Sequence, residues 1–142
     1  VDSAPGSARL IRVAREVNIS KPEWVIEKVA AAAKLTQHRL GREVVVACLG
    51  LAFKANIDDL RESPALDIAV HLAAEGYRVL AVEPHITTLP AALAGRAELV
   101  DLPAALARAD AIVLLVDHRA FGSLTLADLA GKALIDTRGQ IR

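Results

Sequence analysis

The stretch EVVVACLGLAFKANIDDLRESPA, residues 43–65, joins an apolar β-like segment to the start of a helix. Residues 43–49 are almost uninterruptedly apolar, as expected of a parallel strand that is covered on both faces. Ser63 is suited to be the N-cap of the following helix, and Pro64 to be its first residue. The stretch therefore predicts the strand-to-helix crossing of an α/β unit. In open α/β sheets, ligands bind at such crossings, outside the carboxyl ends of the strands.

The chain downstream of this crossing continues to alternate between strand and helix patterns. We predict a helix from residue 63 to about 75, strands at 78–82, near 99–100, 111–116 and 133–136, and helices at 103–109 and 126–129. This alternation predicts an α/β, Rossmann-like parallel sheet with right-handed crossovers and helices on both faces.

Two helices are predicted before the sheet. Apolar residues at helical spacing predict the first over residues 8–17. Ser20-Lys21-Pro22-Glu23 resembles a capping box that starts a second helix, with an apolar face and an end before Gly41.

Composition excludes several classes of function. The chain has 142 residues, of which 54% are hydrophobic, so it can form one domain with a sizeable core. Its 17 basic and 17 acidic residues give a net charge of +0, which favours neither nucleic acid nor an anionic membrane as a partner. The single cysteine excludes an internal disulfide and fits a reducing cytoplasm. No apolar run approaches the roughly 18 residues of a membrane-spanning helix.

Three side chains of the crossing are candidates for ligand contacts. Lys54 lies just past the strand, where one cation can meet a phosphate, although it can also be a solvated surface lysine. Phe53 can stack on a ring or pack in the core. Arg61 can make the bidentate contacts that carboxylates and phosphates prefer, or it can pair with Glu62 or Asp59.

The remaining features of the crossing favour structure over catalysis. Asp58 and Asp59 are better suited to hold Lys54 or Arg61 in place than to act as catalytic acids. Gly50 is the crossing's only glycine, so the G-x-G-x-x-G fingerprint of dinucleotide sites is absent. We therefore expect no complete NAD site within this domain.

Polar residues also follow the last two predicted central strands. Val116-Asp117-His118 and Asp136-Thr137-Arg138-Gly139 should emerge at the same sheet edge as Lys54. Arg138 could then reach the same anion, and two cations with helix N-termini suffice for a diphosphate. Asp117 and His118 either contribute to this site or only form a loop turn.

The cysteine and the other histidines give no sign of catalysis or metal binding. Cys48 lies inside a predicted strand and is expected to be an inert buried thiol. His38, His71 and His85 have no ligand-like spacing, so no metal is predicted.

Residues 50–65 resemble, almost residue for residue, the signature of the C-terminal nucleotide-binding domain of the UDP-glucose/GDP-mannose dehydrogenase family. Residues 14–18 and 21–25 also fit this family, and the resemblance covers residues 8–142. Within the family, residues 116–121 and 136–139 look more like UDP-N-acetylmannosamine dehydrogenases than UDP-glucose dehydrogenases.

The resemblance implies a domain plan and an activity. Enzymes of this family oxidise the C6 hydroxyl of a UDP- or GDP-sugar to a carboxylate with two NAD+, using an N-terminal NAD-binding domain and a central helical region with a catalytic cysteine. The resemblance implies that residues 8–40 are the last part of the central region, through which the enzymes dimerise. It also implies that residues 41–142 form the UDP-sugar-binding domain. Residues 1–7 are expected to be a disordered lead or a cloning remnant of this piece of a longer protein.

The function implied for the parent protein is oxidation of UDP-N-acetyl-D-mannosamine to UDP-N-acetyl-D-mannosaminuronate for surface polysaccharide synthesis. The alternatives are a fragment of a UDP-glucose 6-dehydrogenase, and a freestanding nucleotide-binding or oligomerisation module.

The resemblance also assigns individual residues. It implies that Phe53, Lys54 and Arg138 contact the UDP-sugar and that Arg61 reaches the NAD bound by the missing N-terminal domain. It places no catalytic residue in this chain, so the fragment alone is expected to be inactive. A homodimer is expected through the N-terminal helices, whose apolar face one sheet domain should not cover completely.

Overall fold

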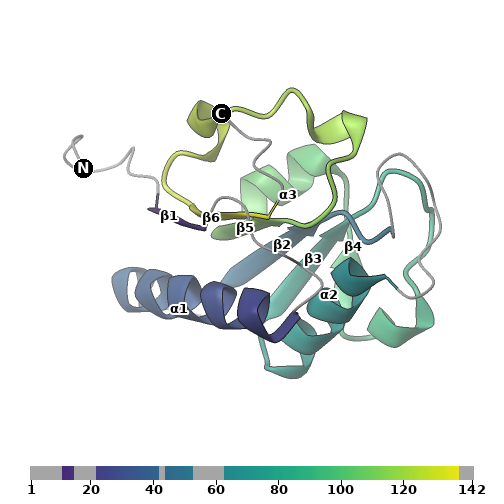
Figure 1. Cartoon of the computed structure of the whole chain (residues 1–142), viewed down its shortest axis with the longest axis horizontal. Helices are drawn as coiled ribbons and strands as arrows, with labels where there is room; N and C mark the ends of the chain where they lie inside the picture. Colours follow the sequence, from purple (N-terminus) through teal and green to yellow (C-terminus); the bar gives the residue numbers. More distant parts are fainter. Residues whose placement is uncertain (1–10, 15–21, 42–43, 53–62, 138–142) are drawn as a thin grey trace.

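The computed structural model describes residues 11–14, 22–41, 44–52 and 63–137 of the chain (Figure 1). The strands are β1 (Ile11–Ala14), β2 (Val45–Leu49), β3 (Arg78–Val82), β4 (Ala97–Leu99), β5 (Ala111–Leu114) and β6 (Ala133–Asp136). The α-helices are α1 (Pro22–Leu40), α2 (Pro64–Ala74) and α3 (Leu102–Arg108). Short 3-10 helices are η1 (Ala91–Leu93), η2 (Arg119–Phe121) and η3 (Leu126–Leu129).

The six strands of the described residues form one sheet in the order β1-β6-β5-β2-β3-β4, and every pairing is parallel. From β2 the chain first builds outward through β3 and β4, and then returns to the other side of β2 to add β5 and β6. The direction of growth therefore reverses between β2 and β5. In doubly wound sheets, this reversal opens the crevice in which ligands bind.

Both faces of the sheet are covered, as expected from its apolar strands. α1 and α2 pack on one face, and α3 with the segment that carries η2 and η3 packs on the other (Figure 1). Alternate residues of β2 serve the two cores, with Val46 and Cys48 in the first and Ala47 and Leu49 in the second. The prediction of a Rossmann-like parallel sheet with helices on both faces is confirmed.

Local signals place the helix boundaries correctly. α1 ends at Leu40, and Gly41 follows with a φ of 71°, a left-handed conformation that favours glycine. Ser63 caps α2 by accepting a hydrogen bond from the Leu66 N–H at 3.2 Å, with Pro64 as the first helical residue. Ser20, which we predicted to cap α1, lies outside the described residues.

The helix predicted over residues 8–17 is wrong where the structure describes it. Residues 11–14 form strand β1, which pairs in parallel with β6 at the edge of the sheet. The β-branched Ile11 and Val13 suit an extended backbone, and the unpaired edge of β6 offers them hydrogen bonds. Among the described residues, one edge strand and one helix therefore precede β2, where the sequence predicted two helices.

The apolar face of α1 is used by the sheet of its own domain. Val25, Val29, Ala32 and Ala33 are buried in the core that α1 shares with α2 and the strands. Leu35 is the exposed large hydrophobic residue of the described chain, at 59% exposure. The uncovered face that we expected to drive self-association is therefore absent from the described part of α1. The domain boundary near residue 40 stays a prediction.

Candidate functional site

The four residues predicted to bind ligand lie outside the described residues. Phe53, Lys54 and Arg61 belong to residues 53–62, together with the two aspartates of the crossing, and Arg138 begins the segment 138–142. Their contacts stay predictions. The structure does describe the residues immediately before and after these segments, and those residues carry the geometry of the site.

The two ends of the β2–α2 crossing are tied to each other. The Ser63 hydroxyl donates a hydrogen bond to the Leu51 carbonyl oxygen at 2.7 Å, and both residues are buried. Ser63 thus caps α2 and also holds the residue that precedes Ala52. The described residues on the two sides of residues 53–62 are therefore bonded to each other.

Gly50 follows β2 and packs closely between the ends of β3 and β5, at the switch point where the strand order reverses. Its φ is 98°, and its N–H donates to the Val82 carbonyl oxygen at 2.8 Å. A Cβ added to Gly50 would lie 2.5 Å from the Cβ of Val116, closer than carbon atoms can approach. Glycine is therefore required here by both conformation and space.

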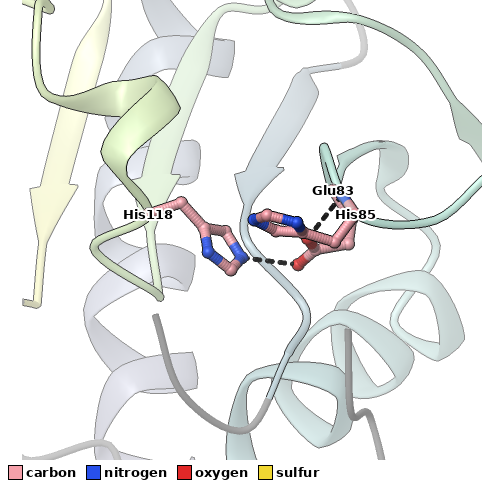
Figure 2. A group of neighbouring side chains, drawn as sticks. All are labelled: Glu83, His85 and His118. Atoms are coloured by element: carbon pink, nitrogen blue, oxygen red, sulfur yellow. Dashed lines mark hydrogen bonds and ion pairs between the residues drawn. The ribbon is translucent and has the colours of Figure 1, made fainter. Parts of the chain in front are cut away.

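Glu83, the residue after β3, connects three segments at the carboxyl edge of the sheet. Glu83 is buried, with a relative exposure of 2% for the whole residue. Oε1 accepts hydrogen bonds from the N–H groups of Leu51 at 2.8 Å and Ala52 at 3.0 Å, and lies 2.8 Å from Nε2 of His118. Oε2 accepts from the N–H of His85 at 3.1 Å. Figure 2 shows the Glu83 carboxylate facing the His118 ring, with the His85 ring beside it.

Hydrogen bonding keeps the Glu83 carboxyl ionised. Burial alone would raise the pKa of Glu83, but the hydrogen bond from His118 and those from the N–H groups of Leu51 and His85 outweigh burial and lower the pKa below its usual value. Because an ionised carboxylate only accepts hydrogen bonds, Nε2 of His118 carries the proton and donates.

His118 is fully buried and is held by rings as well as by Glu83. Its ring centroid lies 4.8 Å from that of His85 and 5.6 Å from that of Phe121. The sequence left open whether His118 only forms a loop turn. The structure shows that its side chain is buried at the carboxyl edge of the sheet and bonded to Glu83. Sequence reasoning missed Glu83 and its contact with His118. A usable signal existed, because a carboxylate and a histidine each follow a strand that flanks β2.

Glu83, His85 and His118 bring their ligand atoms within 4.8 Å of one another, as three metal ligands would. The sequence argument against a metal rested on the spacing of His38, His71 and His85, whereas the fold brings His85 together with His118. The two oxygens of Glu83, however, already accept four hydrogen bonds within the described chain. A cation bound here would have to displace them, so the arrangement favours a hydrogen-bonded cluster.

The residue preceding Arg138 is also fixed at this edge. Thr137 follows β6, and both its N–H (3.1 Å) and its hydroxyl (2.7 Å) donate to the Leu114 carbonyl oxygen of β5. β5 lies between β6 and β2 in the sheet, so the described residues that precede Arg138 and Lys54 follow two strands that are separated by one strand.

Two of the hollows on the surface of the described residues are candidate ligand sites. One of about 420 Å³ lies at the carboxyl ends of β3 and β4, and its mainly apolar lining includes Glu83, Ile86, Val100, Asp101 and Phe121. A wider one of about 870 Å³ lies at the opposite edge, between the end of α1 and the turn after α2. The wider hollow is remote from the carboxyl ends of the strands, where α/β sheets bind ligands, so it is the weaker candidate.

Cys48 is fully buried in β2, and burial raises the pKa of its thiol to about 12. The expectation that this thiol is buried is confirmed, and its raised pKa favours an inert side chain. Among the described residues, no helix has the length and apolar character needed to cross a membrane.

Comparison with known proteins agrees with this geometry. Residues 47–142 match the UDP binding domain of the UDP-glucose/GDP-mannose dehydrogenase family. The chain belongs to this family. The resemblance carried by residues 50–65 is thereby confirmed.

The family relatives include dehydrogenases of acetylated amino sugars. An NDP-N-acetyl-D-galactosaminuronic acid dehydrogenase of Ralstonia nicotianae is 55% identical over 140 residues, which cover 98% of this chain and 32% of the relative. A UDP-N-acetyl-D-mannosamine dehydrogenase of Salmonella typhi is 48% identical over 139 residues, covering 95% and 33%. This chain spans about a third of the length of these relatives.

Solved structures of the family share the fold. The UDP-N-acetyl-mannosamine dehydrogenase of Staphylococcus aureus superposes with a TM-score of 0.64 at 28% identity, covering 88% of this chain and 28% of the other. The UDP-glucose dehydrogenase of Pyrobaculum islandicum gives 0.62 at 31% identity, covering 82% and 26%.

The geometry of this family domain differs from that of a dinucleotide site. In dinucleotide-binding folds, an acidic residue near the end of the second strand binds the ribose hydroxyl. Glu83 occupies the comparable place after β3, but it is directed into the protein toward Leu51, Ala52 and His118. Together with the missing glycine fingerprint, this favours a ligand other than NAD at this edge.

Proposed function

We propose that this chain is the nucleotide-sugar-binding part of an NAD-dependent UDP-sugar 6-dehydrogenase. The match of residues 47–142 to the family's UDP binding domain carries the proposal. The anchored strand ends support it, because they precede the two cations, Lys54 and Arg138, that would meet the diphosphate. Phe53 would contact the same ligand, and Arg61 would reach NAD held by another domain of the parent protein.

The substrate proposed for the parent enzyme is UDP-N-acetyl-D-mannosamine, oxidised at C6 to the uronate for surface polysaccharide. The names of relatives at 48% identity support this sugar. A second candidate is a UDP-N-acetylhexosamine related to galactosaminuronate, favoured by the relative at 55% identity. Initial rates of the parent enzyme with each nucleotide sugar, and with UDP-glucose, separate these candidates.

Binding to the chain itself tests the proposal most directly. We expect calorimetry to detect weak binding of UDP and no binding of NAD, because the chain has a phosphate-binding edge without a glycine fingerprint. We also expect no reduction of NAD+ when the chain is mixed with a UDP-sugar. Tight NAD binding without UDP binding would overturn the proposal.

A homodimer through residues 8–40 is proposed on the resemblance alone. Because α1 packs on its own sheet, the dimer would need the parent protein's preceding residues rather than a free face of α1. Sedimentation of the parent enzyme and of this chain, each over a range of concentrations, measures the difference. A monomeric parent enzyme at high concentration contradicts the dimer.

A further inference from the structure

The residues that precede Phe53 and Lys54 are held by a side chain from another strand. Both N–H groups of Leu51 and Ala52 donate to one carboxylate oxygen of Glu83, at 2.8 and 3.0 Å. Among the described residues, backbone–backbone hydrogen bonds at the end of β2 reach as far as the Gly50 N–H and the Leu49 carbonyl oxygen. Glu83 thus provides hydrogen-bond acceptors for the backbone of Leu51 and Ala52, beyond the end of β2.

We propose that Glu83 is a positioning residue for the UDP ligand, aiming Phe53 and Lys54 by fixing the backbone of Leu51 and Ala52. The inference rests on the proposed function, in which those two side chains bind the nucleotide sugar. Glu83 acts through the backbone and does not touch the ligand.

His118 in turn holds the Glu83 carboxylate in place. Its Nε2–H donates to the same Oε1 that holds the two backbone groups, and both side chains have no exposed area. The Glu83 side chain is therefore held from β5's side as well as from β3. A buried carboxylate with four donors has one stable orientation, since any rotation leaves charge and N–H groups without partners.

The orientation of the Glu83 carboxylate matters for binding because the residues that it anchors are close in sequence to Lys54. Lys54 lies two residues after Ala52 in the sequence, so the anchored backbone of Leu51 and Ala52 is the nearest described support of the segment that carries it. A misplacement of about 1 Å can cost up to roughly a hundredfold in the reaction of a bound substrate. We expect the loss of the Glu83 carboxylate to weaken UDP binding by roughly tenfold.

The test compares two Glu83 variants with a matched control. Glu83→Ala removes the anchor. Glu83→Gln keeps an amide oxygen that can accept from Leu51, Ala52 and His118, although its NH2 group then faces the N–H of His85. The control is Asp110→Ala: the Asp110 carboxylate accepts from the N–H of Val45 at 3.0 Å and so anchors the opposite end of β2.

UDP affinity by calorimetry and the free energy of unfolding by urea titration are measured for each folded variant. We expect Glu83→Ala to lose about tenfold in UDP affinity and Glu83→Gln to recover most of it, while Asp110→Ala is destabilised with its affinity intact. In the parent enzyme, Glu83→Ala should raise the KM for the UDP-sugar without changing the KM for NAD.

Each other outcome has a definite meaning. If the wild-type chain does not bind UDP, the proposed function fails rather than the role of Glu83. If the wild type binds and folded Glu83→Ala binds equally well, the positioning role is wrong. It is also wrong if Asp110→Ala loses as much affinity. Should Glu83→Ala not fold, Glu83→Asp withdraws the carboxylate by one methylene, and wild-type affinity in that variant overturns the proposal.

Discussion

Gly50 and Gly76 share a backbone φ of 98° but have different surroundings. A Cβ on Gly50 would lie 2.5 Å from the Cβ of Val116, whereas one on Gly76 would meet no atom within 4 Å. The pair therefore separates the cost of a left-handed backbone from the cost of a steric clash at the switch point.

Alanine at each glycine gives a testable difference. Gly76→Ala should cost about 1–2 kcal/mol, the strain of a left-handed L-residue. Gly50→Ala should cost about 1–3 kcal/mol more, because β5 must move away from β2. Unfolding free energies from denaturant titration measure both, and equal losses would mean that Val116 yields without cost.

Lys54 and Arg61 are assigned to different ligands, and single substitutions in the parent enzyme can separate them. Lys54→Ala should lose a charge-assisted contact with the UDP-sugar, which costs about 1.5–3 kcal/mol, or roughly tenfold to hundredfold in kcat/KM for the sugar. Arg61→Ala should act mainly on NAD by a similar amount. Steady-state kinetics with each substrate varied in turn would reveal the difference. If both variants weaken only the sugar, the assignment is wrong.

At the scale of elements, local sequence signals predicted most of the sheet and its helices. The Ser63-Pro64 start of α2, the glycines after α1 and α2, and the apolar runs of β2 and β5 each lie within a few residues of the boundary they define. α3 and β4 differ from prediction by only one or two residues at each end.

Non-local contacts explain the parts that were missed. β1 was predicted as a helix because its partner β6 lies about 120 residues away, and a four-residue segment carries too little periodicity to show that pairing. The Glu83–His118 contact joins residues 35 apart in sequence. It depends on β3 and β5 flanking β2, which only the strand order determines.

Ser63 links two elements, so its loss should cost more than that of an ordinary cap. Ser63→Ala removes the cap of α2, worth about 1 kcal/mol, and leaves the buried Leu51 carbonyl oxygen without its hydroxyl donor, worth about 1–3 kcal/mol. Asp101→Ala is the control, because Asp101 caps only α3, at an exposed position. Equal losses of unfolding free energy would show that the bond to Leu51 contributes nothing.

At the scale of the whole molecule, the carboxyl edge of the sheet differs from the rest of the core. Most of the interior is built from alanine and branched aliphatic side chains, whereas Glu83, His118, Asp136 and Thr137 are buried polar residues at this edge. Such groups are costly to bury unless they are hydrogen-bonded. Their concentration where the proposed ligand-binding segments begin links the stability of the domain to its ability to bind.

The acid stability of the domain should therefore report on Glu83. Its pKa is lower in the folded protein than its ordinary value of 4.5, because the hydrogen bonds from His118 and the backbone outweigh the effect of burial. A lowered folded pKa gives stability that is present above pH 4.5 and is lost as the pH falls through the folded value. Glu83→Gln has no such titration, while the imidazoles of His85 and His118 are present in both proteins. We expect the difference in unfolding free energy between wild type and variant to shrink below pH 4.5 in urea titrations at a series of pH values. A difference that stays constant from neutral pH to pH 3 would mean that the charge of Glu83 does not stabilise this edge.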